Sequence, residues 1–102
     1  MAEKRVPHHA LLAIQSMFST VGGLRATWSA VQGAAALGYG RADIVAVIQA
    51  IEPAHFYKSM TSDRNPLAWQ DVYHVPDAAG MLYVKFTDNA VSEMTLLSFK
   101  AR

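Results

Sequence analysis

The sequence contains no cysteine, which excludes disulfide bonds and thiolate metal sites. It also has no apolar run of the ~18 residues that a membrane-spanning helix needs. The opening residues, Met1 to Arg5, lead into no apolar core of a signal peptide. These absences favour a protein of the cytoplasm that does not cross a membrane.

An excess of charge of one sign is also missing, because the formal net charge is only +1. Residues 1 to 53 hold four basic and three acidic side chains, and residues 54 to 102 hold five of each. No broad electrostatic attraction to nucleic acid is therefore expected, and only a local basic patch would serve. The residues available for such a patch are Lys58, Lys85, Lys100 and Arg102, together with His55 and His74. From charge alone, a solvated surface of mixed sign is the simpler interpretation.

The chain has 102 residues, of which 52% are hydrophobic, and this is enough for one packed domain over residues 1–102. Its N-terminal half has helical spacing. A first helix is predicted from Pro7, which suits a first turn, with Leu11, Ile14, Phe18 and Val21 on one face up to Gly22-Gly23.

Two more helices are predicted after a short extended piece at Leu24 to Ala26. Thr27 is a good N-cap for the first of them, and Gly38 is a suitable left-handed terminator. The other begins at Arg41, carries Asp43 in its first turn, and ends before Pro53. Its buried side is predicted to consist of Ile44, Val47, Ile48 and Ile51.

These two helices admit a second interpretation as a DNA-binding helix-turn-helix. A recognition helix needs polar and basic side chains on its exposed face, and the helix from Arg41 offers essentially Arg41 and Gln49. Packing against a sheet accounts for the helices better.

In the C-terminal half the hydrophobic period changes to two, which predicts β-strands. The predicted strands are Phe56–Thr61, Trp69–Tyr73, Met81–Thr87 and Met94–Lys100, with hairpin connections at 75–80 and 88–92. The fold class expected is α+β, with N-terminal helices on the apolar face of a mainly antiparallel sheet from the C-terminal half.

Alternation predicts which side chains lie on the open face of this sheet. Leu82, Val84 and Phe86 form the apolar side of one strand, and Thr95, Leu97 and Phe99 are grouped on one side of the last strand. The open face is then expected to carry Tyr83, Lys85, Ser98 and Lys100. The pattern does not assign a face to Lys58, because it shares its parity with Phe56 and Met60.

Established catalytic motifs are absent, since there is no Walker loop, dinucleotide-binding glycine turn, nucleophile elbow or H-E-x-x-H. Asp71 is the only carboxylate inside a strand motif, and the histidines have no local ligand partner, so neither paired acids nor a metal or other cofactor is expected.

The remaining chemistry is a set of Lys, Tyr, Gln and His on a sheet, and such a set is able to cut RNA without metal. RNA carries its own nucleophile, the 2′-hydroxyl. Lysine and tyrosine, with reference pKa values of about 10.4 and 10, stabilise charge or donate protons as they stand, whereas His8 and His55 need no shift to act near neutral pH. Each residue also has an ordinary structural interpretation: lysines at strand edges oppose aggregation, and tyrosines pack amphipathically.

Five motifs in order resemble one known family: Glu3-Lys4-Arg5 with Pro7-His8, Phe56 to Thr61, Trp69 to Tyr73, Leu82 to Lys85, and Ser98 to Lys100. Along almost its whole length the chain is similar to the MqsR toxins, the motility quorum-sensing regulators of bacterial toxin-antitoxin pairs. The resemblance implies a compact fold like that of the RelE toxins. It also implies a ribosome-independent mRNA interferase that cleaves at GC-containing sequences.

The same resemblance implies site residues and a partner. The catalytic positions would be Lys58, Gln70, Tyr83 and Lys100, and Tyr57 would bind substrate, with His8 as a further candidate. Tyr73 and His74, at the end of the second strand motif, are also expected to bind substrate. The implied partner is an antitoxin with a zinc-binding N-terminal domain and a helix-turn-helix C-terminal domain. A non-catalytic nucleic-acid-binding or regulatory module is the alternative.

Two departures from the family pattern bear on the substrate. His74 stands where the family has an arginine, which weakens a phosphate contact or makes it depend on pH. The loops Ser62 to Leu67 and Asp88 to Glu93 also differ, which leaves the base preference open.

Overall fold

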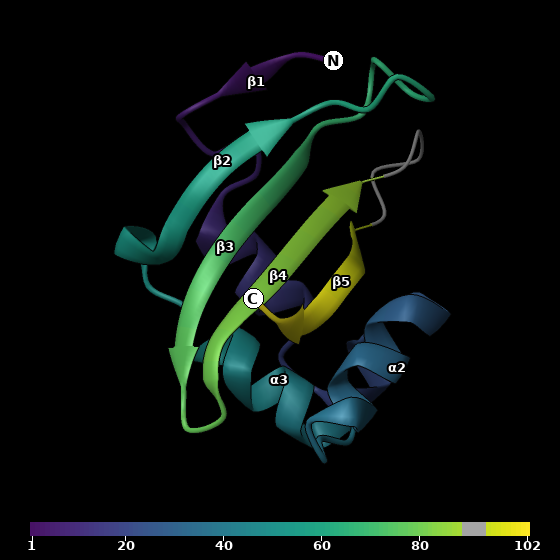
Figure 1. Cartoon of the computed structure of the whole chain (residues 1–102), viewed down its shortest axis with the longest axis vertical. Coiled ribbons are helices and arrows are strands. Elements are labelled where there is room, and N and C mark those ends of the chain that lie inside the picture. Colours follow the sequence, from purple (N-terminus) through teal and green to yellow (C-terminus); the bar gives the residue numbers. More distant parts are fainter. Residues whose placement is uncertain (89–93) are drawn as a thin grey trace.

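The computed structural model describes residues 1–88 and 94–102, and Figure 1 shows its helices and strands. In chain order they are β1 Glu3–Lys4, α1 Leu11–Met17, η1 Val21–Gly23, α2 Trp28–Ala36, α3 Arg41–Gln49, η2 Pro53–His55, β2 Phe56–Met60, β3 Gln70–Asp77, β4 Gly80–Asp88 and β5 Met94–Ala101, where η marks a short 3₁₀ helix. This order confirms the α+β class. Apart from Asp88, the hairpin predicted at 88–92 lies outside the described residues.

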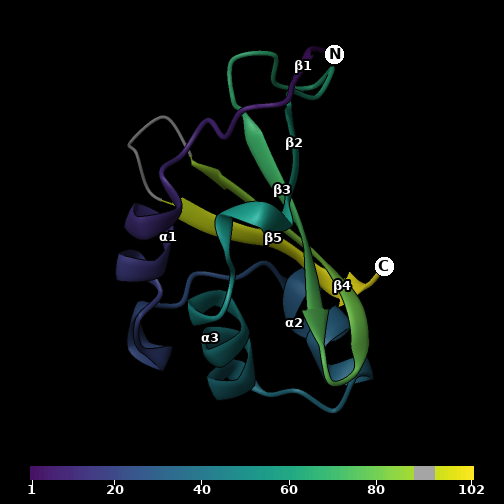
Figure 2. The ribbon, with the colours of Figure 1, turned by 90° about the vertical axis from the view of Figure 1, so that its left-hand side faces the viewer.

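The strands form one sheet in the order β1-β2-β3-β4-β5, and each is antiparallel to its neighbours. In Figure 2 the helices lie together on one side of this sheet, as predicted. The prediction of a sheet from the C-terminal half alone was incomplete, because β1 adds an edge strand with Glu3 opposite Met60 and Lys4 opposite Ser59. A strand of two residues has no period that alternation could reveal.

The first helix begins later than predicted. Its N-cap is Ala10 rather than a residue before Pro7, and Val21 is 44% exposed although Ile14 and Phe18 are buried. The main-chain N–H groups of His8 and His9 donate to the carboxylate of Asp71, and α1 begins only after this contact, at Leu11. Pro7 therefore lies in the non-helical segment between β1 and α1.

The second and third helices agree with the sequence. The Thr27 hydroxyl accepts a hydrogen bond from the Ala30 N–H at 3.1 Å, and Gly38 follows with a φ of 79°. The Asp43 carboxylate accepts from the Gly40 N–H at 2.8 Å. The described residues contain no helix long and apolar enough to cross a membrane.

The two polar side chains that a recognition helix would use are occupied within the fold. Arg41 donates to the Leu24 carbonyl at 2.7 Å, and the Gln49 amide donates to the carbonyls of Gln15 and Phe18 at 2.7 and 3.1 Å. These contacts tie α3 to the segments beside it, which disfavours the helix-turn-helix interpretation.

The strand pattern is right in β4 and wrong in part of β5. Leu82, Val84 and Phe86 are fully buried, but in β5 the buried residues are Met94, Leu96 and Phe99. The register shifts between Lys85, opposite Ser98, and Phe86, opposite Leu96, so Leu97 is an extra residue. This β-bulge reverses the alternation and invalidates the predicted grouping of Thr95 and Leu97 with Phe99. Similarly, β3 continues to Asp77, so its hairpin is shorter than predicted.

Helix α2 lies against β5 at a point that only glycine fits. A Cβ atom built on Gly33 would lie 2.1 Å from the Phe99 carbonyl oxygen. We expect Gly33→Ala to lower the free energy of unfolding by about 1–3 kcal/mol, because helix and strand must separate. Gly22→Ala is the control, since the nearest atom there is 4.0 Å away. Equal unfolding midpoints in urea for the two variants would contradict this packing.

Candidate functional site

The face of the sheet away from the helices carries a row of paired polar side chains. His74 on β3 pairs with Tyr83 on β4, which pairs with Lys100 on β5. Directly paired residues project to the same side of an antiparallel sheet. The intervening row of Tyr73, Val84 and Phe99 is buried under the helices, so the polar row lies on the opposite, open face. Tyr83 and Lys100 thus share a face as predicted.

A second row begins with Lys58, and a β-bulge explains why its face was ambiguous. Phe56 pairs with Tyr73 on the core side, but the register shifts before Lys58, which pairs with Val72. Val72 in turn pairs with Lys85, so both lysines lie on the open face. Gln70, two residues before Val72 on the same strand, shares this face. All four predicted catalytic residues therefore lie on one surface.

Ring contacts connect the aromatic residues of this surface. Tyr57 stacks on His74 with ring centroids 4.2 Å apart, and the His74 and Tyr83 rings are 6.0 Å apart. The Lys100 ammonium lies 5.4 Å from the Tyr83 ring centroid, and the Lys58 ammonium 5.5 Å from that of Tyr57. From here on, the open face means the surface of the sheet formed by the side chains of Tyr57, Lys58, Gln70, His74, Tyr83, Lys85 and Lys100.

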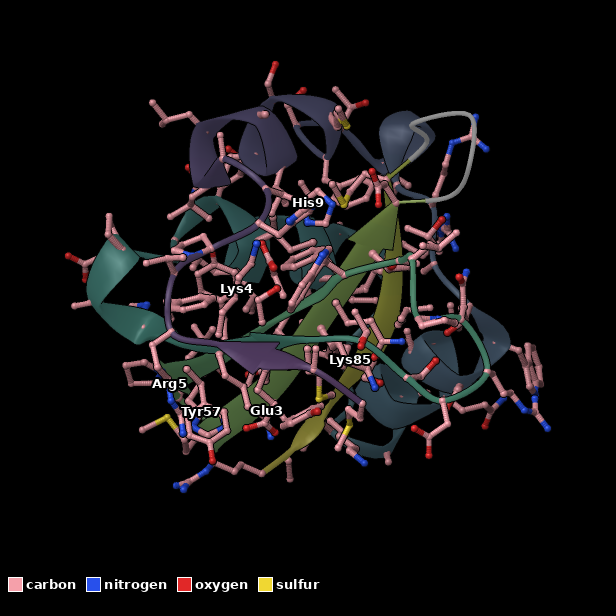
Figure 3. All side chains as sticks on the ribbon, turned by 90° about the horizontal axis from the view of Figure 1, so that it is seen from above. Glu3, Lys4, Arg5, His9, Tyr57 and Lys85 are labelled. Carbon is pink, nitrogen blue, oxygen red and sulfur yellow. The ribbon has the colours of Figure 1, made fainter. Side chains whose placement is uncertain are left out.

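An ion pair with Glu3 of β1 favours the positively charged form of Lys58. Its ammonium lies 2.6 Å from the Glu3 carboxylate, and this contact raises the pKa of Lys58 and lowers the pKa of Glu3. Figure 3 shows Glu3 and Tyr57 on one side of the β1 ribbon and Lys4 on the other. Sequence reasoning missed Glu3 as part of the site, because the pairing of β1 with β2 was not foreseen.

The pKa values of His74 and Tyr83 are also shifted on the open face. Burial lowers the pKa of His74, and the nearby Arg102 lowers it further. Burial raises the pKa of Tyr83, against a smaller opposing effect of Lys58. Near neutral pH, His74 is therefore a neutral ring and Tyr83 a neutral phenol that can donate a hydrogen bond.

Lys85 is the member of the open face that the site prediction left out. Burial lowers the pKa of its ammonium, and the neighbouring Lys100 adds to this effect. Its Nζ atom lies 6.0 Å from the Tyr83 ring centroid. The alternation of β4 had already placed it on the open face, but nothing in the sequence marks it as less exposed than other lysines.

Three other histidine and tyrosine candidates lie away from the open face. Tyr73 is 1% exposed and packs in the core beside Phe56 and Phe86, where burial raises its pKa to about 12. His8 stacks on Trp69, and its Nδ1 atom lies 2.9 Å from the Lys4 ammonium. His55 accepts a hydrogen bond from the Glu52 N–H. The placement of Tyr73 corrects the expectation that it is available to substrate.

Beneath the sheet, Asp71 binds the N-terminal segment. Its fully buried carboxylate accepts hydrogen bonds from the Ser59 hydroxyl at 2.6 Å and from the main-chain N–H groups of His8 and His9. The His9 ring lies between two carboxylates, with Nδ1 3.3 Å from Asp71 and Nε2 3.2 Å from Asp88. Asp71 thus fixes the segment that carries Glu3 toward Lys58.

In residues 1–88 and 94–102, no group of three or more His, Asp or Glu side chains is arranged to hold a metal ion. The open face instead offers ammonium groups, two phenols, an imidazole and a carboxamide. Such groups bind phosphate, stabilise developing negative charge and transfer protons. This arrangement suits a reaction at a phosphodiester.

Comparisons with known proteins agree with this chemistry. The family described as "Motility quorum-sensing regulator, toxin of MqsA" matches residues 6–101. The mRNA interferase toxin MqsR of Escherichia coli strain K12 is 34% identical over 100 residues, which cover 98% of this chain and 99% of that protein.

Proposed function

The chain belongs to the family of motility quorum-sensing regulator toxins, and from this membership we propose that it is an mRNA interferase, the toxin of a toxin-antitoxin pair. The observation that carries the proposal is identity of 34% along nearly the full length of a protein named for this activity. The open face supports it independently, because it gathers side chains suited to phosphodiester chemistry.

In the proposed reaction the RNA supplies the nucleophile. The 2′-oxygen attacks the adjacent phosphorus, a charged phosphorane forms, and the bond to the 5′-oxygen breaks. Lys58 and Lys100 stabilise the phosphorane, Tyr83 donates a hydrogen bond to it, and Gln70 orients the strand. The stacked rings of Tyr57 and His74 offer a platform for a base. The products are a 2′,3′-cyclic phosphate and a 5′-hydroxyl.

The proposed partner is an MqsA-type antitoxin, because the family is described by that pairing. A zinc-binding N-terminal domain and a helix-turn-helix C-terminal domain in that antitoxin remain predictions from the resemblance. A substrate of mRNA places the proposed activity in the cytoplasm. Neither a membrane nor direct DNA binding by the toxin alone is part of the proposal.

The function is tested with purified protein, a single-stranded RNA that contains GC steps, and excess chelator. We expect cleavage to continue, because the proposed roles belong to Lys, Tyr and Gln side chains and need no divalent metal ion. Cleavage products are resolved on a denaturing gel. Cleavage that depends on added magnesium or manganese would contradict the proposed mechanism.

Lys58→Ala distinguishes a nuclease from a binding module in the same assay. The variant should stay folded by circular dichroism, lose cleavage, and no longer arrest growth when it is expressed. A wild-type protein that shifts RNA in a gel but leaves it intact would favour the non-catalytic alternative. Equal toxicity of wild type and variant would remove Lys58 from the site.

A further inference from the structure

Two lysines of the open face lie in opposite environments on either side of one residue. Val72 pairs with Lys58 on β2 and with Lys85 on β4, so the two side chains rise from the same face with about 10 Å between their strands. Lys58 contacts Glu3 at 2.6 Å. For Lys85, no carboxylate within ion-pair distance is found in the described part of the chain, and its neighbours on β5 are Ser98 and Lys100.

These environments act on the ammonium charge in opposite directions. The carboxylate of Glu3 raises the pKa of Lys58, whereas burial, with Lys100 nearby, lowers the pKa of Lys85. Where two titratable groups in one site are driven apart in this way, the group that loses its proton more readily is suited to act as base. The other remains a fixed cation.

Other titratable and charged groups share this face with the two lysines. They are Glu3 from β1, Tyr57 from β2, His74 from β3, Tyr83 from β4, and Lys100 and Arg102 near the end of the chain. Glu3 is engaged with Lys58, and Tyr83 holds its proton more tightly than usual. The ring of His74 is covered on one side by Tyr57, which favours a role in stacking.

We propose that Lys85 is a catalytic residue of the reaction inferred above, the general base that accepts the proton of the RNA 2′-hydroxyl. This inference rests on the proposed function. Neutral Lys85 takes the proton as the bond from the 2′-oxygen to phosphorus forms. The bond from phosphorus to the 5′-oxygen then breaks, and the leaving oxygen receives a proton from Tyr83 or a lysine ammonium. Afterwards Lys85 returns its proton to solvent.

A base must be neutral to act, and this sets the sign of the pH dependence. The single-turnover rate should rise with pH through the pKa of Lys85 and level off above it. A lysine that only supplied positive charge would give the opposite trend, because deprotonation would remove its contribution. The direction of the pH dependence therefore separates the two roles.

The experiment compares Lys85→Arg with wild type in single-turnover cleavage of the same RNA across a pH series. Arginine keeps the positive charge but is not deprotonated in proteins, so we expect a loss of about a hundredfold and loss of the rising limb. RNA affinity should change little. Lys4→Arg is the matched control, because Lys4 lies on the other side of the sheet beside Trp69. Retention of the wild-type rate in Lys85→Arg would overturn the role of base.

A titration without RNA tests the inference about Lys85 separately from the proposed function. Nitrogen-15 NMR of the lysine side chains, assigned with Lys85→Arg and Lys58→Arg, should show Lys85 losing its proton at lower pH than Lys58. The reverse order would overturn the inference even if the wild type cleaves RNA. A wild-type protein that does not cleave RNA would overturn the proposed function, and the catalytic role of Lys85 with it.

Discussion

Lys100→Ala and Tyr83→Phe are each expected to lower the single-turnover rate of RNA cleavage by about a hundred- to thousandfold. This corresponds to ~2.7 to 4 kcal/mol, the usual loss when one preorganised donor to a developing charge is removed. Both groups lie on the open face, with the Lys100 ammonium 5.4 Å from the Tyr83 ring centroid. The phosphorane carries more negative charge than the substrate, so these donors act mainly on the transition state.

The measurement must separate an effect on the rate of the cleavage step from effects on RNA affinity and on protein stability. RNA affinity and the thermal midpoint should change far less than the rate, because both side chains project from the sheet away from the core. Lys4→Ala is the control, because Lys4 lies on the other side of the sheet beside Trp69. The products should carry a 2′,3′-cyclic phosphate and a 5′-hydroxyl. If the products carry a 5′-phosphate instead, water is the nucleophile, and the roles assigned to Lys58, Lys85 and Lys100 must be abandoned.

The sequence predicted the helices and the open face correctly wherever the hydrophobic period is regular. Helix α3 and strand β4 follow their hydrophobic patterns, and Tyr83, Lys85 and Lys100 project as alternation requires. Prediction failed where one extra residue interrupts a strand. The bulge in β2 turns Lys58 to the open face despite its parity with Phe56, and the bulge in β5 separates Leu97 from Phe99.

Contacts between distant parts of the chain were the other limit. The pairing of Glu3 with Lys58 and the binding of His8 and His9 to Asp71 join residues more than 50 positions apart. The prediction for Tyr73 was wrong for a related reason. It stands in a motif that the family resemblance marks, but its strand position directs it into the core.

Asp71 connects these distant contacts to the site. It fixes the main chain at His8 and His9, a few residues after β1, and β1 places Glu3 against Lys58. The carboxylate is buried on the helix side of the sheet and touches no residue of the open face. Its contribution to the proposed reaction is therefore indirect, through the position of the N-terminal segment.

The contributions of Asp71 and His9 to stability depend on pH in opposite directions. Burial alone would raise the pKa of Asp71, but hydrogen bonds from His9, Ser59 and the main chain outweigh it and lower the pKa. The stability that ionised Asp71 supplies is thus present above its unfolded pKa and lost as pH falls through the folded value. Burial opposes charge on His9, yet Asp71 and Asp88 together raise its pKa. That contribution is complete below the unfolded pKa and lost as pH rises through the folded value.

Asp71→Ala is therefore expected to lower the free energy of unfolding by about 3–5 kcal/mol at pH 6, where both charges are present in the wild type. Removal of the carboxylate leaves the Ser59 hydroxyl and the N–H groups of His8 and His9 without their acceptor. In a domain of this size the thermal midpoint should fall by more than about 10 °C. Asp63→Ala is the control, since that side chain is 92% exposed and forms its ion pair with the terminal amine at the surface.

Asp71→Asn makes the test specific to charge. The carboxamide has nearly the same shape but only one oxygen to accept, and its NH₂ group faces donors. Chemical denaturation between pH 4 and 8 should show a smaller loss than in Asp71→Ala. The wild-type decline in stability from pH 6 to 8 should flatten, because the charge on His9 then has only Asp88 as its partner. If the wild type and Asp71→Asn lose stability equally over this range, His9 and Asp71 are not coupled, and the N-terminal segment must be held by other contacts.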